Sequence, residues 1–225
     1  MPIPRDDTLH VWQVALGITS PSSLSLLSAE ERSRAARFSF TRGRDRYVAG
    51  RAALRAVLGG YLERDPANLL LEIGEHGRPA LSGVTRVEFN ITHSEDLALI
   101  AITARGPVGV DVESLRTIDR ALDLARRYLH PNELALVEAA PPAERSTIFL
   151  TCWTRKEAVL KSTGVGLTRD TRLLDVGATT VEKRLDLPGF PPLRVTSFAP
   201  QKGFIAACAT APAVRAFELL RFDPA

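Results

Sequence analysis

The sequence predicts a fold in which helices and strands occur in separate runs, the arrangement of the α+β class. In the first half, helix-like patterns over residues 28–37 and 44–62 precede a set of strand-like runs, and the second half repeats this order. A polar Gly-Pro break at Gly106 separates the halves and leaves no room for a long linker. We therefore expect two small domains, residues 1–106 and 107–225.

The first half opens with a helix that Ser28 can cap. Glu31 stands three residues later, which is the spacing of a capping box. The second helix carries apolar side chains at helical spacing. Three strand-like runs follow, at residues 69–73, 87–91 and 97–103. The last two are predicted to form a hairpin through residues 93–96.

The second half opens with a strand at residues 108–113. Helices are expected at 119–128, 132–139 and 143–163, and strands at 181–187, 193–198 and 204–210. The hairpins of the two halves are alike, because each places a polar turn before an apolar, alanine-containing strand that ends in Thr. This likeness is compatible with a duplicated unit.

The composition is that of a globular protein of 225 residues, 45% hydrophobic, with a net charge of +3. The positive charge suits an anionic partner without identifying it. Zinc-finger spacing and RNA-binding motifs do not occur, so we expect no nucleic-acid partner. No apolar run approaches the ~20 residues of a membrane helix, and the amino terminus lacks the layout of a signal peptide. We expect a cytoplasmic protein with no membrane partner, in which Cys152 and Cys208 are buried free thiols.

Two carboxylates share one face of the strand at residues 108–113. Asp111 and Glu113 are two residues apart and point to the same face, whereas Val110 and Val112 point to the other. Like charges this close repel unless a cation lies between them, and oxygen ligands with room for water and a phosphate suit Mg²⁺. The pair therefore indicates a metal site for a phosphorylated substrate. The solvated face of an edge strand gives the same pattern, and spacing alone does not exclude it.

The helix at residues 143–163 adds a third carboxylate. Its apolar residues recur at helical spacing, and Gly164 is a natural stop. Glu157 and Lys161 lie four apart, one and two turns beyond Trp153 on the same row. They either form an ordinary surface ion pair or direct a carboxylate and an ammonium into a site.

Several motifs, in their order along the chain, resemble the Sfp-type 4′-phosphopantetheinyl transferases. They are Ser28-Ala29-Glu30-Glu31-Arg32-Ser33-Arg34, Glu75-His76-Gly77-Arg78-Pro79, Phe89-Asn90-Ile91-Thr92-His93-Ser94, Gly109-Val110-Asp111-Val112-Glu113, Trp153-Thr154-Arg155-Lys156-Glu157-Ala158-Val159-Leu160-Lys161 and Gly164-Val165-Gly166-Leu167. The resemblance covers most of the chain. It implies a pseudo-twofold pair of α+β subdomains with the active site in the cleft between them. It also implies an activity: transfer of the phosphopantetheine arm of coenzyme A to a serine of a carrier protein, with Mg²⁺ and release of 3′,5′-ADP.

The resemblance also assigns roles to residues. Asp111, Glu113 and Glu157 match the metal ligands, for Mg²⁺ or alternatively Mn²⁺. Glu157, or a water held by the carboxylates, would take the serine proton, and Lys161 would contact the phosphates and stabilise the leaving oxyanion. The other expected contacts to coenzyme A, the co-substrate, are Arg34, Gly77, Arg78, Pro79, Asn90, Thr92 and His93. By themselves the two arginines are ordinary surface residues, and a histidine in a hairpin turn is usually just exposed.

Some relatives have a basic residue where Glu31 stands, which would remove one phosphate contact here. Carrier docking is expected on residues 114–133. Its basic and apolar side chains would meet the acidic face and apolar patch of a carrier protein: Arg116, Arg120, Arg126, Arg127, Leu115, Ile118 and Leu122. The alternative is a solvated helix face.

Acyl, polyketide and peptidyl carriers all fit this interpretation, and a monomer is expected because both halves of the cleft lie in one chain. One alternative is a Mg²⁺-dependent nucleotide hydrolase, although no Walker-type glycine-rich loop accompanies the carboxylates. A second alternative is a non-catalytic carrier- or nucleotide-binding relative. The presence of Lys161 and all three carboxylates argues against it.

Overall fold

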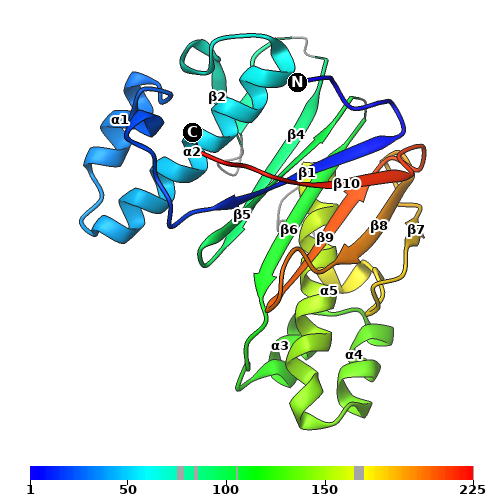
Figure 1. Ribbon diagram of the computed structural model, residues 1–225. Coiled ribbons are helices and arrows are strands. Elements are labelled where there is room, and N and C mark those ends of the chain that lie inside the picture. The colour runs from blue at the N-terminus through cyan, green and yellow to red at the C-terminus, as the bar shows by residue number, and fades with distance from the viewer. Residues whose placement is uncertain (75–78, 84–85, 105, 165–169, 225) are drawn as a thin grey trace. The chain divides into compact units, whose positions relative to one another are not determined.

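The computed structural model describes residues 1–74, 79–83, 86–104, 106–164 and 170–224. The chain divides into two compact units (Figure 1). Unit 1 comprises residues 1–105 together with 216–225, and unit 2 comprises residues 106–215. Both units combine helices with strands, so the fold is of the α+β class that the sequence predicts.

Unit 1 contains a four-stranded sheet in the order β10-β1-β5-β4 and a separate pair, β2-β3. Its elements are β1 (Thr8–Ala15), η1 (Pro21–Leu24), α1 (Ala29–Ala36), α2 (Thr41–Leu62), η2 (Pro66–Asn68), β2 (Leu71–Ile73), β3 (Pro79–Leu81), β4 (Glu88–Ser94), β5 (Leu97–Thr103) and β10 (Ala216–Arg221), where η marks a 3₁₀ helix. The apolar face of α2 packs on this sheet, with Leu54 and Leu58 in one buried cluster with Ile100 and Ile102. Burial of this helix face against the sheet forms the core of unit 1.

Two strands of this sheet, β1 and β10, were not predicted. The alternation of buried side chains in β1 breaks at Gln13, which weakens the strand signal. β10 is an edge strand with mostly exposed side chains, and it pairs in parallel with β1 from the far end of the chain. The expected second domain, residues 107–225, is therefore wrong at its end, because residues 216–225 belong to unit 1.

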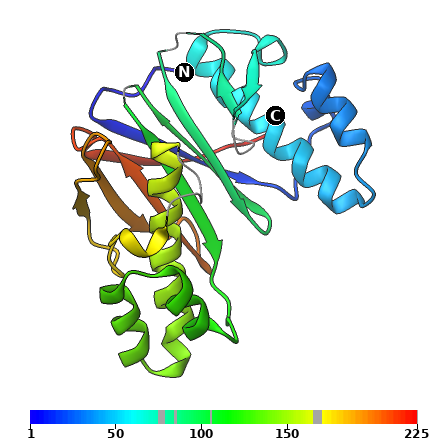
Figure 2. The ribbon, with the colours of Figure 1, turned by 180° about the vertical axis from the view of Figure 1, so that it is seen from behind.

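Unit 2 contains the antiparallel sheet β6-β9-β8-β7. Its elements are β6 (Val108–Ser114), α3 (Ala121–Tyr128), α4 (Pro131–Ala139), α5 (Pro142–Thr163), η5 (Thr171–Leu173), β7 (Lys183–Leu185), β8 (Leu193–Phe198) and β9 (Phe204–Thr210). α5 lies across β6, β9 and β8 (Figure 2). Every helix and strand predicted for this half is present, with β7 shorter than expected.

Cys152 and Cys208 are buried free thiols, as predicted. Burial raises the pKa of the Cys152 thiol to about 12, so this sulfur stays protonated at neutral pH. Within the part of the chain that the structure describes, no helix has both the length and the hydropathy that crossing a membrane requires.

Candidate active site

α5 lies directly on β6 because Gly109 has no side chain. A Cβ added at Gly109 would stand 1.9 Å from the backbone oxygen of Ala158 and 2.6 Å from the backbone nitrogen of Ser162. Both atoms belong to the backbone of α5, so a larger residue would force the helix away from the strand. The glycine therefore sets how closely Glu157 and Lys161 of α5 approach Asp111 on β6.

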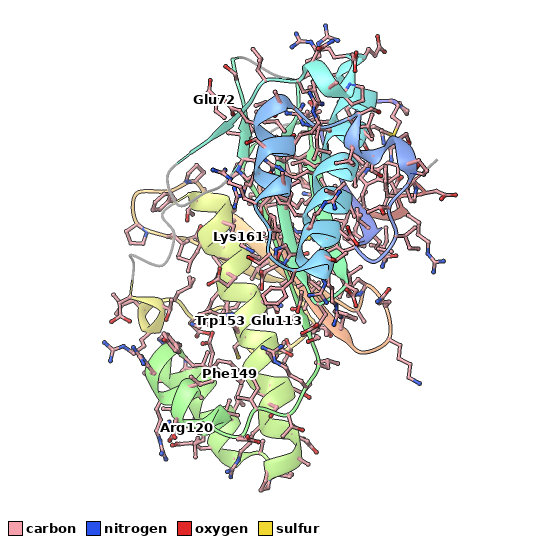
Figure 3. The ribbon with its side chains drawn as sticks, turned by 90° about the vertical axis from the view of Figure 1, so that its left-hand side faces the viewer. Glu72, Glu113, Arg120, Phe149, Trp153 and Lys161 are labelled. Atoms are coloured by element: carbon pink, nitrogen blue, oxygen red, sulfur yellow. The ribbon has the colours of Figure 1, made fainter. Side chains whose placement is uncertain are left out.

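Lys161 of α5 reaches across to β6. Its Nζ lies 2.6 Å from Oδ1 of Asp111 and 3.3 Å from the backbone oxygen of Val110. Asp111 is only 6% exposed, whereas the Lys161 side chain is 27% exposed, so the pair is partly buried. Figure 3 shows Lys161 on the same helix as Trp153, two turns along. Spacing alone did not show where the ammonium of Lys161 points. In the structure it points at the carboxylate of Asp111 on the neighbouring strand.

Glu157, one turn before Lys161 on α5, belongs to the same cluster. Burial raises the pKa of Glu157, the charges of Asp111 and Glu113 raise it further, and Lys161 opposes them. Within the described residues, Oε1 of Glu157 is buried and has no hydrogen-bond partner. A buried carboxylate oxygen without a donor is unfavourable unless a proton or a cation satisfies it.

The three carboxylates supply the oxygen ligands that a hard divalent cation prefers, but they are not closed around one. Among the residues described here, no group of three His, Cys, Asp or Glu side chains is arranged to hold a metal ion. Mg²⁺ needs only one or two carboxylates, because waters and substrate phosphates complete its shell. In this structure cations of the chain balance the acids: Lys161 pairs with Asp111, and Arg116 donates to Glu113 over 2.8 Å. The residues fit a divalent cation in two respects: all three ligands would be oxygens, and Oε1 of Glu157 has no other partner within the described residues.

Two cations of the same motif, Arg155 and Lys156, do not reach this cluster. Arg155 is buried and donates to the backbone oxygens of Val176 and Thr179, each over 2.8 Å. Lys156 is fully buried and pairs with Glu133 at 2.8 Å. Both therefore hold α5 in place, which sequence reasoning did not identify.

Trp153 also belongs to the core of unit 2. Its ring stacks on Phe149 with centroids 6.1 Å apart and meets the edge of Tyr128 at 5.4 Å. These contacts join α3 to α5 below the acidic cluster. Within this motif, Lys161 contacts Asp111, and the charge of Asp111 acts on Glu157.

In unit 1, β4 carries three residues that were expected to contact coenzyme A. His93 is exposed, whereas Asn90 and Thr92 are buried. Because side chains alternate along a strand, Asn90 and Thr92 point to one face and His93 to the other. His93 lies within the strand opposite Ala98, and the turn is formed by residues 95 and 96, so the expected hairpin turn began two residues too early. The structure thus separates His93 from its two predicted companions.

The other predicted coenzyme A residues of unit 1 are distributed over two elements. Arg34 is exposed on α1, with its guanidinium carbon 5.3 Å from the ring centroid of Tyr47. Pro79 begins β3 and is buried. Gly77 and Arg78 lie outside the described residues.

The segment expected to dock a carrier protein has basic side chains that already have partners within the chain. Arg116 donates to Glu113, Arg120 to Asp123 and Arg126 to Glu138, and Arg127 lies over the Tyr128 ring. Ile118 and Leu122 are half-buried against the core formed by α3, α4 and α5, whereas Leu115 is 40% exposed. The exposed ion pairs are weak enough to exchange for a partner's acids.

Residues 107–202 match the family described as the 4′-phosphopantetheinyl transferase superfamily, and residues 19–105 match the description 4′-phosphopantetheinyl transferase, N-terminal. The chain is 33% identical over 211 residues to the 4′-phosphopantetheinyl transferase HetI of Nostoc sp., covering 91% of this chain and 88% of that protein. The chain belongs to the 4′-phosphopantetheinyl transferase family. A 4′-phosphopantetheinyl transferase of Bacillus subtilis is 28% identical over 196 residues, and Sfp of Bacillus subtilis strain 168 is 26% identical over the same length. Each of these two matches covers 84% of both chains.

Membership of this family makes the protein a transferase enzyme. The alternatives of a nucleotide hydrolase and of a non-catalytic binding module are therefore set aside. The two family matches end and begin at residues 105 and 107, where the chain passes from unit 1 to unit 2.

Proposed function

We propose that this transferase moves the 4′-phosphopantetheine arm of coenzyme A to a serine hydroxyl of an apo carrier protein, releases 3′,5′-ADP, and depends on Mg²⁺. Family membership supports the transfer. The proposed metal dependence rests on Oε1 of Glu157, which is buried and has no hydrogen-bond partner within the described residues. The negative charges of Asp111 and Glu113 also raise the pKa of Glu157. A divalent cation would satisfy this oxygen and offset the repulsion among the three acids.

Asp111, Glu113 and Glu157 would hold Mg²⁺ together with the pyrophosphate of coenzyme A, and the ion would neutralise charge as phosphorus is attacked. Glu157 accepts the serine proton, directly or through a water held by the carboxylates. The serine oxygen bonds to the β-phosphorus, and the bond from this phosphorus to the oxygen of 3′,5′-ADP breaks. Lys161 donates a hydrogen bond to the leaving oxygen and limits its build-up of charge.

For coenzyme A binding by unit 1, we propose that Arg34 contacts the 3′-phosphate and that His93 contacts phosphate and adenosine. Both side chains are exposed, as contact with a ligand requires. The same proposal gives Arg78 a contact to the 3′-phosphate, and places Gly77 and Pro79 beside it. Asn90 and Thr92 lie on the opposite face of β4 from His93 and are assigned a supporting role for the strand.

The substrate class that fits is an acyl, polyketide or peptidyl carrier protein. Residues 114–133 are the proposed docking segment, because arginines held in exposed ion pairs can exchange partners with an acidic helix. We also propose that the enzyme acts as a cytoplasmic monomer, since all the assigned roles fall on one chain. Light scattering of the purified protein, alone and with coenzyme A, measures the oligomeric state.

The deciding experiment incubates the protein with coenzyme A, Mg²⁺ and a panel of apo carriers, and weighs the products by mass spectrometry. We expect at least one carrier to gain one phosphopantetheine group, with stoichiometric release of 3′,5′-ADP. The same carrier with its serine replaced by alanine, and the same reaction with a chelator, should show no gain. Release of 3′,5′-ADP without any modified carrier would instead indicate hydrolysis and contradict the proposal.

A further inference from the structure

Next to Glu157 on α5 lies a buried ion pair that the proposed chemistry does not use. Lys156 and Glu133 are both fully buried, with Nζ of Lys156 2.8 Å from Oε2 of Glu133. Lys156 also donates to the backbone oxygens of Thr171, over 2.9 Å, and Leu174. Its ammonium therefore has three acceptors from two different segments, which is full satisfaction for its three donors.

Glu133 is equally well satisfied. Its Oε1 accepts from the backbone nitrogens of Val176, over 2.7 Å, and Gly177, over 3.1 Å. Its Oε2 accepts from the backbone nitrogen of His130 over 3.0 Å, which closes the capping box of α4. One ion pair thus fastens α4, α5 and residues 171–177 to one another.

Unit 1 contains an equivalent buried ion pair. Arg55 of α2 is 2% exposed and pairs through Nε with Oε2 of Glu31. Its Nη1 donates to the backbone oxygens of Pro66, over 2.8 Å, and Leu69, over 3.1 Å. Glu31 in turn accepts from the backbone nitrogen of Ser28 and closes the capping box of α1. Both units therefore share one arrangement. A buried cation on the long helix pairs with a helix-capping glutamate and donates to backbone carbonyls of the segment that follows the long helix.

The cations of the two ion pairs occupy the same position in their helices. α2 and α5 are both 22 residues long, and Arg55 and Lys156 are each the fifteenth residue. The next residue differs: it is Ala56 in α2 and Glu157 in α5. Only the ion pair of unit 2 therefore adjoins a side chain of the acidic cluster.

We propose that the Glu133–Lys156 pair is a positioning device for Glu157. α5 is held on its β6 side by the contact at Gly109 and on another side by this pair. Each helical residue advances 1.5 Å and turns through 100°, so a small slide or roll of α5 moves Glu157 relative to Asp111. A misplacement of about 1 Å in a reacting group is enough to lower a rate by about 10²-fold. The inference rests on the proposed function, because it assigns the pair to the same reaction.

Two matched double variants test the inference. Glu133→Gln with Lys156→Met removes both charges of the unit 2 pair, so that neither charge is left buried alone, and keeps an amide oxygen as an acceptor. Glu31→Gln with Arg55→Met removes the corresponding two charges in unit 1. It also takes the carboxylate away from Arg51, whose Nε lies 2.9 Å from Oε1 of Glu31. Thermal melting, Mn²⁺ binding by electron paramagnetic resonance, and the Mg²⁺ and coenzyme A dependence of turnover are measured for both.

Both variants should melt at lower temperature than the native protein. Only the unit 2 variant should weaken Mn²⁺ binding, raise the Mg²⁺ concentration for half-maximal rate and lower kcat, each by about tenfold or more. The unit 1 variant should keep the native Mn²⁺ affinity and Mg²⁺ dependence. Equal shifts in the two variants, or native Mn²⁺ affinity and kcat in the unit 2 variant, would overturn the inference and leave the pair a purely structural element.

A single variant, Lys156→Arg, keeps the test decisive where the double variant does not fold. The guanidinium retains the charge but is a longer, planar fork that does not reproduce a point-charge donor. We expect a folded protein with weaker Mn²⁺ binding and lower kcat, and native values of both would again overturn the inference. The native protein serves as the control for the proposed function: absence of Mg²⁺-dependent transfer there refutes that function, whereas normal native transfer with unaffected variants refutes the inference alone.

Discussion

In both units a strand pairs with the second strand of a hairpin, and a 22-residue helix lies between them in the sequence. The register allows the two strands to be compared residue by residue. Trp12 of β1 pairs with Ile100, and Asp111 of β6 pairs with Ala207. Each partner stands three residues before the threonine that ends its strand. Trp12 of unit 1 therefore occupies the position that Asp111 occupies in unit 2.

The same register sets His10 against Gly109 and Val14 against Glu113. Where unit 2 has carboxylates, unit 1 has Trp12 and Val14, and the indole nitrogen of Trp12 donates to the Tyr61 hydroxyl over 3.0 Å. Both units have a long helix packed on a sheet, so this arrangement alone does not produce the acidic cluster. The units differ at a few equivalent strand positions and at one glycine that lets α5 approach β6, and the proposed chemistry of unit 2 rests on these differences.

The largest expected effect comes from the substitution Asp111→Ala. Losing one member of the metal-binding set should lower kcat by roughly 10²–10³-fold, while the protein stays folded because fewer like charges are crowded together. The counterpart in unit 1, Trp12→Phe, should lose stability and keep its transfer rate. Steady-state kinetics with Mg²⁺ and circular dichroism measure both. Near-native transfer by the Asp111 variant would remove the chemical distinction between the units.

Lys161→Ala should be the next most damaging change. It removes the proposed donor to the leaving oxygen and leaves Asp111 without its ammonium partner, so turnover should fall by about 10²-fold. Lys161→Arg should recover little of it, because a planar fork does not replace a point-charge donor. If both variants melted earlier but turned over at the native rate, the ion pair with Asp111 would be structural only.

Gly109→Ala tests the close approach of helix and strand that distinguishes unit 2. The added methyl group meets the backbone of α5, so we expect a loss of about 1–3 kcal/mol in the free energy of unfolding. Turnover should fall as well, since α5 carries Glu157 and Lys161. Gly17→Ala in unit 1 is the control, because no atom lies within 4 Å of its added Cβ. Denaturant titration and initial rates of both variants give the result, and equal stability of the two would show that α5 can shift freely.

The smallest effect concerns the pH dependence of unit 1. Burial lowers the pKa of His10 from 6.5, and the charge of Glu218 opposes this change. The fold therefore favours the neutral imidazole, and its contribution to stability is present above pH 6.5 and is lost as the pH falls toward the lowered pKa. His10→Gln should flatten the dependence of the unfolding free energy between pH 7.5 and 5.5, measured by urea titration. An identical slope in the two proteins would mean that the histidine titrates alike in the folded and unfolded states.

The parts of the molecule that sequence could predict are those with a strong local pattern. α5 and β5 carry long apolar series, and Gly164 marks the end of α5. The type of both elements, and their bounds to within one residue, therefore followed from local sequence. β1 pairs with β5 and β10, and β10 pairs with β1, so the partners of both strands lie far away in the sequence, outside any local window. Glu157 and Lys161 could be selected only with the family resemblance, because an ordinary surface ion pair on a helix has the same spacing. The burial of Lys156 could not be predicted either, because it depends on Glu133, a partner on another helix.

The return of β10 to unit 1 has a consequence for biosynthesis. Residues 216–221 are translated after all of unit 2, so until then the sheet of unit 1 is one strand short and β1 is its edge. Unit 2 is continuous in sequence and needs nothing from later residues to close its own sheet. The unit that is translated second is therefore the first whose sheet can be completed, and the unit translated first must wait for it.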